Sequence, residues 1–432
     1  MEKKLIRVGI LGFGVVGSGT LKTLRDNEAS IDLKVGAPVR VKWVADLDWT
    51  RPRPVEVAVE ESQRTLEAEA VVSDPEVDIV VETIGGITPA RELVLAALHN
   101  GKSVVTSNKE LIAKHGREIL EEAARHSADI YFEGSVGGGI PILRPLKQCL
   151  AGNRIHRLMG IVNGTTNYIL TQMEREGKDF EEALREAQAR GYAEKPDASN
   201  DIDGYDAVYK LTILAAIAFQ RRVAVEEVYR EGIGRISARD ITYARQLGYV
   251  IKLLAIGADT PTGVELRVHP TFLPKEHPLA AVSDVFNAIF VEGSSVGEVM
   301  FYGRGAGALP TGSAVVGDII DVARNLMKGA TGRIPCTCFE GKRTKDISEL
   351  ETKYYLRTRV PDRPGVLAAL AKVFGEEGVS LAQILQTDAS GQSAEIVWVT
   401  HQVQEARLQR SLERISALPE LQELCNCIRV EG

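Results

Sequence analysis

The pattern with the clearest chemical content is an aspartate and a lysine at the start of an apolar helix. Asp206 and Lys210 are four positions apart, so on a helix they share one face. The stretch that follows, Leu211–Phe219, is apolar nearly all round, which is typical of a buried helix. A surface ion pair is the ordinary interpretation of this spacing, but a buried charged pair is costly unless it serves a function. We therefore predict that Asp206 and Lys210 take part in catalysis.

Lys109 is a second candidate for proton transfer. It follows Asn108 directly after the apolar run 103–107, which predicts a strand. A lysine at the carboxyl end of a strand can exchange a proton with a ligand if a second ammonium group or burial lowers its pKa. A solvated surface lysine is the alternative.

Two further segments could contact a small polar substrate. Asn163–Asn167 gathers small polar side chains around Gly164, and it fits either an ordinary turn or a set of backbone N–H groups offered to a carboxylate. Glu194 could bind an ammonium group, although a lone glutamate is more often simply exposed.

Other chemistries lack the residues that they need. None of the seven histidines lies at metal-ligand spacing from another. Cys149 has no evident histidine partner, which argues against an acylating enzyme. The pairs Cys336-Thr-Cys338 and Cys425-Asn-Cys427 are spaced more tightly than usual zinc ligands. We interpret the five cysteines as reduced structural thiols.

A glycine-rich motif indicates which element positions these groups. Gly12-Phe13-Gly14-Val15-Val16-Gly17 stands between an apolar strand at 5–11 and a helical pattern that runs through Leu24. The glycines of G-x-G-x-x-G allow a tight turn, a close approach of a pyrophosphate and close packing of helix on strand. The helix N-terminus then favours the phosphates. The motif predicts dinucleotide binding.

The choice between NAD and NADP stays open at this point. A second strand, Val39–Ala45, ends at Asp46, and an acidic residue there usually accepts hydrogen bonds from the adenosine ribose of NAD. Arg51 and Arg53 lie just beyond and could instead meet the 2′-phosphate of NADP.

Strands and helices alternate through the first part of the chain. Apolar strands at 78–82 and 103–107 are each followed by a helical pattern, which predicts a doubly wound parallel sheet of the Rossmann type. Ligands of such sheets bind beyond the carboxyl ends of the strands, where Gly12, Thr83 and Asn108 lie.

The rest of the chain predicts two more regions that contain both helices and strands. A glycine-dense hinge at 133–141, a strand-rich portion at 250–300 and a glycine-rich loop at 303–312 suggest an α+β middle domain. The last part has the order strand–helix–strand–strand–helix–strand, which is ferredoxin-like. We expect a dinucleotide-binding domain at 1–133 with 308–330 packing back on it, a catalytic and oligomerisation domain at 134–307, a linker at 331–350 and a regulatory domain at 351–432.

The composition excludes several classes of partner. The 432 residues carry 52 basic and 59 acidic side chains, a formal charge of −7, which argues against binding to nucleic acid or to a membrane surface. No apolar run approaches the length of about 18 residues that suggests a membrane span, and no signal peptide fits the first residues. We therefore expect a cytoplasmic protein.

Taken together, these motifs resemble the homoserine dehydrogenase family, with a C-terminal ACT domain, over essentially the full length. The resemblance rests on six segments: Gly12–Gly17, Thr106–Leu111, Glu133–Pro141, Gly160–Leu170, Ala187–Lys210 and Gly303–Thr311. Its most specific parts are Asn163–Leu170 and the pattern Asp201-Ile-x-Gly-x-Asp206-x-x-x-Lys210. One departure is Ala193–Asp201, where a proline has moved and one residue is inserted relative to the usual family pattern.

The resemblance implies reversible oxidation of L-homoserine to L-aspartate 4-semialdehyde with NADP or NAD, in threonine, methionine and isoleucine biosynthesis. It implies that Lys210 and Lys109 transfer the proton, while Asp206 holds Lys210 or the substrate hydroxyl. The implied substrate contacts are Glu194, Gly164, Thr165 and Asp201, and the implied cofactor contacts are Gly12, Phe13, Gly14, Val15, Val16, Gly17, Asp46, Thr83, Asn108, Lys109 and Gly307. A monovalent cation such as sodium is implied at Glu133, Val136, Gly138 and Ile140, mostly through backbone oxygens.

The resemblance also implies regulation and assembly. The loop Asp362-Arg-Pro-Gly365 and the segment Ser380–Gln386 resemble an ACT domain, for which feedback inhibition by L-threonine is expected. A homodimer or homotetramer is expected as well. The alternative is a non-catalytic regulator that senses a nucleotide and an amino acid, but such a protein would have no need of Asp206 and Lys210.

Overall fold

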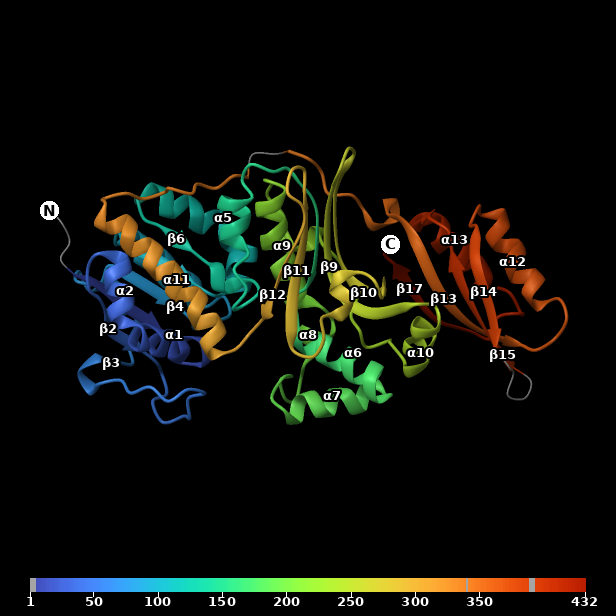
Figure 1. The fold of residues 1–432 in the computed structure, drawn as a ribbon, viewed down its shortest axis with the longest axis horizontal. Coiled ribbons are helices and arrows are strands. Elements are labelled where there is room, and N and C mark those ends of the chain that lie inside the picture. The colour runs from blue at the N-terminus through green and yellow to red at the C-terminus, as the bar shows by residue number, and fades with distance from the viewer. Residues whose placement is uncertain (1–4, 339–340, 388–392) are drawn as a thin grey trace. The chain divides into compact units, whose positions relative to one another are not determined.

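The computed structural model describes residues 5–338, 341–387 and 393–432 (Figure 1). The chain divides into two compact units, each assembled from separate stretches. Unit 1 comprises Met1–Ile155, Tyr209–Val225 and Phe286–Gly341, and unit 2 comprises His156–Val208, Glu226–Val285 and Lys342–Gly432.

A six-stranded sheet in the order β3-β2-β1-β4-β5-β6 forms the centre of unit 1. Its strands are β1 (Ile6–Leu11), β2 (Val39–Ala45), β3 (Arg64–Thr65), β4 (Ile79–Glu82), β5 (Ser103–Thr106) and β6 (Ile130–Tyr131), and all neighbours are parallel. The helices between them are α1 (Val15–Asp26), α2 (Glu28–Val35), α3 (Ala68–Ser73), α4 (Ala90–His99) and α5 (Lys109–Arg125). Strand β1 stands beside both β2 and β4, so the strand order reverses there and the predicted Rossmann-type sheet is confirmed.

A helix from much later in the chain covers one face of this sheet. Helix α11 (Ala308–Met327) packs against α1, and its apolar side chains share one buried core with β1. Two glycines allow this close approach: a Cβ atom on Gly19 would lie 2.0 Å from the Ala308 carbonyl oxygen, and one on Gly312 would lie 2.6 Å from the Gly19 carbonyl carbon. Gly307 is the N-cap of α11, with φ of +123°.

Unit 1 also holds a hairpin and part of a buried helix. Strands β11 (Phe286–Gly293) and β12 (Gly297–Arg304) pair antiparallel. Helix α9 (Tyr205–Ala218) runs on from unit 2 and contributes its residues from Tyr209 onward to unit 1.

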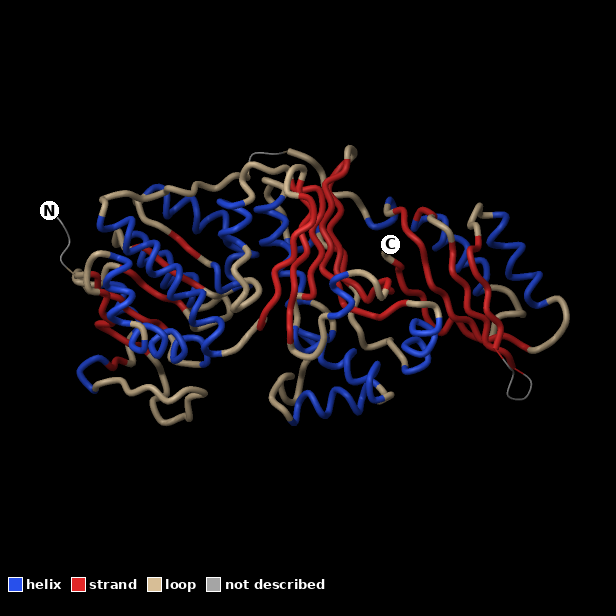
Figure 2. The backbone as a smooth tube through the Cα atoms, in the orientation of Figure 1, coloured by secondary structure: helices blue, strands red, loops and turns tan. Residues whose placement is uncertain are grey.

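In unit 2 the strands follow the order β7-β9-β10-β17-β13-β15-β14. They are β7 (Ile155–Ile161), β9 (Tyr249–Thr260), β10 (Gly263–Pro274), β17 (Glu423–Val430), β13 (Glu351–Pro361), β15 (Ser393–Thr400) and β14 (Leu381–Thr387), while the short strands β8 (Tyr229–Arg230) and β16 (Val403–Gln404) pair with β10 and β13. The helices are α6 (Gly164–Glu176), α7 (Phe180–Ala189), α8 (Ser199–Ile202), α10 (Ala238–Gln246), α12 (Val366–Glu376) and α13 (Glu405–Ser416). Figure 2 separates the helices from the strands along this path.

The C-terminal part of unit 2 has the predicted ferredoxin-like order, β13–α12–β14–β15–α13–β17. Its core gathers Tyr354, Leu370, Phe374 and Trp398, all buried between the strands and the two helices. The indole N–H of Trp398 donates to the Thr358 hydroxyl at 2.9 Å, which satisfies its one polar group.

The C-terminal part is joined to the β9–β10 hairpin by strand pairing and by buried ion pairs. Strand β17 pairs in parallel with β10, with Thr271 opposite Arg429 and Phe272 opposite Val430. Arg267 of β10 pairs with Glu431 at 2.7 Å, and Asp240 of α10 pairs with Arg357 of β13 at 2.9 Å, while Arg429 and Glu405 pair at 2.9 Å within the C-terminal part beside them. We call these pairs and the β10–β17 ladder the junction.

Some strands and helices have too weak a pattern of apolar residues to be predicted from the sequence. Strands β3 and β6 have two residues each, which is too short for any periodicity. Helix α2 buries only Ile31 and Val35, so its apolar face is faint. Within the described ranges, no helix is both long and apolar enough to cross a membrane.

Candidate functional site

The turn after β1 has the geometry that dinucleotide binding needs. Gly12 has φ of +89°, and a Cβ atom there would lie 2.8 Å from the backbone of Thr83. A Cβ atom on Gly17 would lie 2.0 Å from the Gly12 carbonyl oxygen, and the Thr83 hydroxyl donates to that oxygen at 2.7 Å. Gly14 is the N-cap of α1, and no side chain caps this helix. The first N–H groups of α1 are therefore available to a phosphate.

Asp46 lies at the end of β2 among positive groups. Its carboxylate accepts the backbone N–H of Phe13 at 2.6 Å. Nη2 of Arg51 lies 3.1 Å and Nη2 of Arg53 lies 3.7 Å from the carboxylate oxygens of Asp46. Nη1 of Arg53 is buried with no hydrogen-bond partner among the described residues. The charge of Asp46 is thus balanced by two guanidinium groups.

A buried glutamate that sequence reasoning did not single out organises the loops after β4 and β5. Oε1 of Glu82 accepts the N–H groups of Ile84 and Gly85 at 2.8 and 3.1 Å, and Oε2 accepts the Thr106 hydroxyl at 2.5 Å. Burial raises the pKa of Glu82. The available signal was an acidic residue at the end of an otherwise apolar strand.

Asn108 continues this network to the start of α5. Its N–H donates to the Thr106 hydroxyl at 2.9 Å, and its side-chain oxygen caps α5 by accepting the N–H of Leu111 at 3.0 Å. Its side-chain amide donates to the Gly86 carbonyl oxygen at 2.6 Å. These bonds fix the position of Lys109, the first residue of α5.

The two candidate lysines lie on neighbouring helices of unit 1. Lys109 is half-buried at the start of α5, and Lys210 is buried on α9, with 8% of its surface exposed. The ammonium group of Lys114 on α5 lies 5.2 Å from the ring centre of Tyr209 on α9. Further along the same unit, Arg222 pairs with Glu121 at 3.1 Å. The helix that carries Lys210 therefore contacts the helix that begins with Lys109, at Tyr209 and Lys114.

Unit 2 brings two carboxylates onto one amide. Asn163 is the N-cap of α6, and its side-chain oxygen accepts the N–H of Thr166 at 2.8 Å. This fixes the orientation of the amide, whose nitrogen donates to Asp201 at 2.7 Å and to Asp206 at 2.8 Å. The Thr165 hydroxyl has one proton and two acceptors within reach, the Tyr192 carbonyl oxygen at 2.6 Å and the other oxygen of Asp201 at 2.9 Å. We call Asn163, Thr165, Asp201 and Asp206 the carboxylate cluster.

The segment around Gly164 is a helix start, so its interpretation as an ordinary turn is wrong. Gly164 and Thr165 are the first residues of α6, and a Cβ atom on Gly164 would lie 3.0 Å from the Val285 carbonyl oxygen. Glu194 lies in the exposed loop between α7 and α8. Among the described residues no hydrogen bond joins its carboxylate to the carboxylate cluster, and its carbonyl oxygen accepts the Gln188 amide at 3.1 Å.

This arrangement suits a small polar substrate and a proton transfer. Two carboxylates that share a neutral donor keep negative charge available for an ammonium or hydroxyl group. Asp206 is 2% exposed and lies one turn before Lys210 on α9. A buried aspartate followed by a buried lysine supplies both an acceptor and a donor for a proton.

The loop expected to hold a monovalent cation is buried and rich in backbone oxygens. The carboxylate of Glu133 is engaged: it accepts the N–H groups of Ile142, Leu143 and Arg144 at 2.6, 2.8 and 2.7 Å. No hydrogen bond of the described residues ends on the carbonyl oxygens of Val136, Gly138 or Ile140. Carbonyl oxygens are preferred ligands of hard cations, so the donor set fits such an ion.

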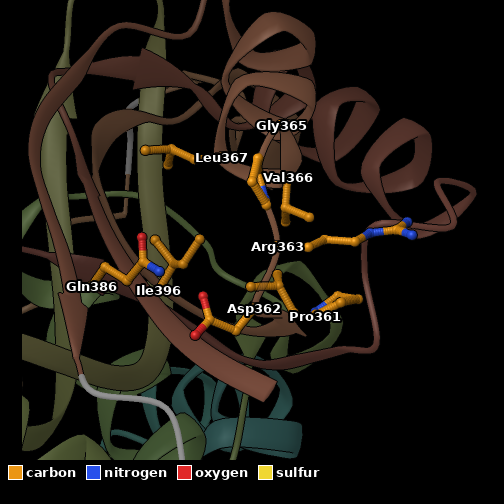
Figure 3. A pocket seen from close by; sticks show the side chains of 10 residues that line it. Pro361, Asp362, Arg363, Gly365, Val366, Leu367, Gln386 and Ile396 are labelled. Atoms are coloured by element: carbon orange, nitrogen blue, oxygen red, sulfur yellow. The ribbon is translucent and has the colours of Figure 1, made fainter. Parts of the chain in front are cut away.

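A pocket in the C-terminal part of unit 2 offers a separate ligand site. Its cavity of about 350 Å³ is lined by the loop Val360–Leu367 together with Gln386 and Ile396 (Figure 3). Gly365, with φ of +94°, is the N-cap of α12, and no side chain caps that helix. Figure 3 shows the carboxylate of Asp362 on the side of Gln386 and Ile396, while Arg363 extends away from them. Open N–H groups and a carboxylate are the partners that a free amino acid needs.

Comparisons with known proteins match the whole chain. Family models for the homoserine dehydrogenase NAD-binding domain, homoserine dehydrogenase and the ACT domain match residues 12–133, 141–320 and 354–420. A homoserine dehydrogenase of Synechocystis is 46% identical, over 98% of this chain and 99% of its own. The crystal structure of a homoserine dehydrogenase from Thiobacillus denitrificans superposes with a TM-score of 0.94 at 41% identity and covers 100% of both chains. A hyperthermophilic archaeal homoserine dehydrogenase in complex with NADPH has a TM-score of 0.61 at 29% identity and covers 74% of this chain and 97% of its own.

Proposed function

The chain belongs to the homoserine dehydrogenase family of oxidoreductases, and from that premise we propose which of its residues perform the reaction. The reaction is the reversible oxidation of L-homoserine to L-aspartate 4-semialdehyde. The carbon that bears the hydroxyl loses a hydride, the hydroxyl loses a proton, and a C=O bond forms. When bound, the nicotinamide dinucleotide accepts the hydride, so the chain's own side chains must handle the proton.

Lys210 takes the hydroxyl proton, and Lys109 exchanges protons with it. Burial disfavours a charged ammonium group and so makes a lysine a better proton acceptor. The burial of Lys210 and the position of Lys109 at the start of the neighbouring helix support this assignment. Asp206 orients Lys210 or the substrate hydroxyl, as its place one turn earlier on α9 favours.

Asp201 binds the substrate ammonium group, with Thr165 and the first N–H groups of α6 beside it. The support is that the hydrogen bonds of Asp201 come from a neutral amide and a neutral hydroxyl, which leave its charge for a cationic partner. The exposed Glu194 gains no such support from its contacts, so the proposal rests on Asp201.

NADP is the preferred cofactor in this proposal. The phosphates rest on the turn Gly12–Gly17 and on the open N-terminus of α1, with Thr83, Asn108 and Gly307 around them. Arg51 and Arg53 lie beside Asp46, and Nη1 of Arg53 is buried with no hydrogen-bond partner among the described residues. Because a 2′-phosphate would accept hydrogen bonds from these guanidinium groups, they favour NADP. Sodium or a similar cation binds the carbonyl oxygens of Glu133, Val136, Gly138 and Ile140.

L-Threonine is the proposed inhibitor at the pocket of the C-terminal part. Its ammonium group meets Asp362 and its carboxylate meets the open N-terminus of α12. The protein acts in the cytoplasm as a homodimer or homotetramer. Strand β12 supports an assembly, because it lies at the end of its strand order and exposes Met300 and Tyr302.

One observation carries the proposal: a single amide, that of Asn163, binds both Asp201 and Asp206 at the start of the helix that carries Lys210. The test is a steady-state assay of the purified protein with L-homoserine and either NADP or NAD, followed at 340 nm. We expect reduction of the cofactor, with a lower KM for NADP. Absence of reduction with both cofactors would overturn the proposal.

The same assay tests regulation. L-Threonine is expected to inhibit the wild type, and Asp362→Asn is expected to raise the threonine concentration at half inhibition by at least about tenfold while kcat stays unchanged. Equal sensitivity of the two proteins would remove the effector site from this pocket.

A further inference from the structure

Two histidines and a glutamate meet on the surface of unit 1 at the ends of α4 and α5. His99 is the last residue of α4, Glu122 lies in the last turn of α5, and His126 is the C-cap of α5. One possible ligand atom from each residue lies within 4.8 Å of the others. The sequence shows no histidines at ligand spacing, because only the packing of α4 on α5 brings residues 99 and 126 together.

The two oxygens of Glu122 have different partners. Oε2 lies 3.3 Å from Nε2 of His99 and 3.6 Å from Nε2 of His126. Oε1 pairs with the guanidinium group of Arg125. The carboxylate therefore directs one oxygen toward both imidazoles, while its other oxygen is occupied. In a tetrahedral zinc site, bonds of about 2.0–2.2 Å put neighbouring ligand atoms about 3.3–3.6 Å apart.

We propose that His99, Glu122 and His126 bind a Zn²⁺ ion. Two of the three separations already match those around a single zinc ion, and two imidazole nitrogens with one carboxylate oxygen are a ligand set that zinc accepts. The imidazole rings, with centroids 4.9 Å apart, face the same carboxylate from different helices. The side chains of His99 and His126 are 54% and 37% exposed, so water can complete the coordination.

The ion ties the C-terminal end of α4 to that of α5. The 17 residues of α5 place this end about 25 Å from Lys109, so the zinc does not take part in the hydride or proton transfer. Its effect is on stability, because a ligand that binds only the folded state shifts the unfolding equilibrium.

The test is a zinc titration of the full chain after removal of metals with EDTA. Calorimetry is expected to give one ion per chain for the wild type, and His99→Ala and His126→Ala are each expected to weaken zinc binding by at least about tenfold. Cobalt in place of zinc is expected to give the visible absorption bands of a low-coordinate site in the wild type alone. Zinc is expected to raise the Tm of the wild type by a few degrees and to leave the Tm of both variants unchanged.

Two controls separate this site from weaker alternatives. His115→Ala removes a histidine on the same helix, which lies 3.8 Å from Glu118, and it is expected to leave zinc affinity unchanged. Cys336→Ser combined with Cys338→Ser tests the thiols, and binding is expected to persist in this variant. The proposal is overturned if the two histidine variants bind like the wild type, if the cysteine variant loses the ion, or if the wild type binds none below about 1 mM.

Discussion

The carboxylate cluster contains the half-buried Asp201 and the junction contains the buried Asp240, and the partners of these two aspartates differ. In the carboxylate cluster, Asp201 is bound by the amide of Asn163 and the hydroxyl of Thr165. At the junction, Asp240 accepts the guanidinium of Arg357 at 2.9 Å, together with Ser237 and Asn426.

This difference distinguishes a charge that holds elements together from one that we propose binds the substrate. Burial would raise the pKa of Asp240, but hydrogen bonds from Arg357, Ser237 and Asn426 hold it below the usual value. Its charge is therefore used to hold α10 to β13 and β17. Asp201 has neutral donors instead, so its charge remains available to a cationic ligand. We infer that variants of the first kind reduce stability, whereas variants of the second kind reduce turnover.

The largest effect is expected for Lys210→Ala. Removing the proposed proton acceptor is expected to lower kcat by about 10³–10⁴-fold, since general-base catalysis and proton positioning are both lost. Steady-state kinetics measure this effect, and circular dichroism checks that the variant folds. The control is Lys372→Ala, which removes an exposed lysine from α12. A kcat of Lys210→Ala within tenfold of the wild type would remove the catalytic role of this residue.

Arg357→Ala is expected to affect stability instead of turnover. It leaves Asp240 and Glu395 without their shared guanidinium, and loss of one partner of a buried ion pair costs about 3–5 kcal/mol of unfolding free energy. Urea unfolding followed by fluorescence gives the change, and kcat measured below the transition is expected to match the wild type. The matched control, Arg359→Ala, breaks an exposed pair with Glu423 and is expected to cost less than about 1 kcal/mol.

Lys252 is a third kind of buried charge, a cation that is bound by neutral oxygens. It is 1% exposed, and its ammonium group donates to the Val282 carbonyl at 2.7 Å and to the Asn167 side-chain oxygen at 3.3 Å. Burial lowers the pKa of Lys252 to about 8. The folded state therefore binds fewer protons than the unfolded state between about pH 8 and 10.5, so stability rises with pH across that window.

The variant Lys252→Met is expected to remove this dependence. The quantity to compare is the free energy of unfolding of the wild type minus that of Lys252→Met. This difference is expected to increase by about 3 kcal/mol between about pH 8 and pH 10.5. Urea unfolding at several pH values measures both free energies. Taking their difference removes the contribution of the groups that titrate in both proteins. Parallel pH profiles would contradict the prediction.

The smallest effect is expected for Asn163→Ser, which separates two roles of one side chain. Serine also caps helices well, so the stability of α6 is expected to change by less than about 1 kcal/mol. The amide that binds Asp201 and Asp206 is lost, and kcat/KM for L-homoserine is expected to fall by about 10–100-fold. Asp179→Ser, at the N-cap of α7, is the control and is expected to leave kcat/KM unchanged.

The dinucleotide site is the part that the sequence predicts best, because its signals are local. Gly12, Gly14 and Gly17 lie within six residues, between a strand and a helix that their own apolar patterns predict. Asp46 follows the next strand, so its place at the same edge of the sheet comes from the strand order. The ferredoxin-like order of the last part is predicted for the same reason, because the apolar residues of each strand and helix recur with a clear period.

Contacts between residues that are far apart in the sequence could not be predicted from the sequence alone. Asn163, Asp201 and Asp206 are brought together by the packing of α6 and α8, and no periodic pattern records that contact. The buried Glu82 and the pair of His99 and His126 are further examples. The family resemblance implies a cation site at Glu133, but no local sequence pattern reveals that the Glu133 carboxylate caps the turn at 142–144.

The contact between α1 and α11 has a consequence for the order in which the chain folds during synthesis. Val315, Ile319 and Val322 of α11 complete the core that lies over β1, yet about 175 residues separate β6, the last strand of this sheet, from this helix. At about 5–20 residues per second, a ribosome needs on the order of ten seconds or more to add them. Throughout that interval the apolar face beneath α11 has no cover from its own helix. A nascent chain that stops before residue 308 is therefore expected to bind general chaperones, and one released after residue 327 is expected to lose that binding.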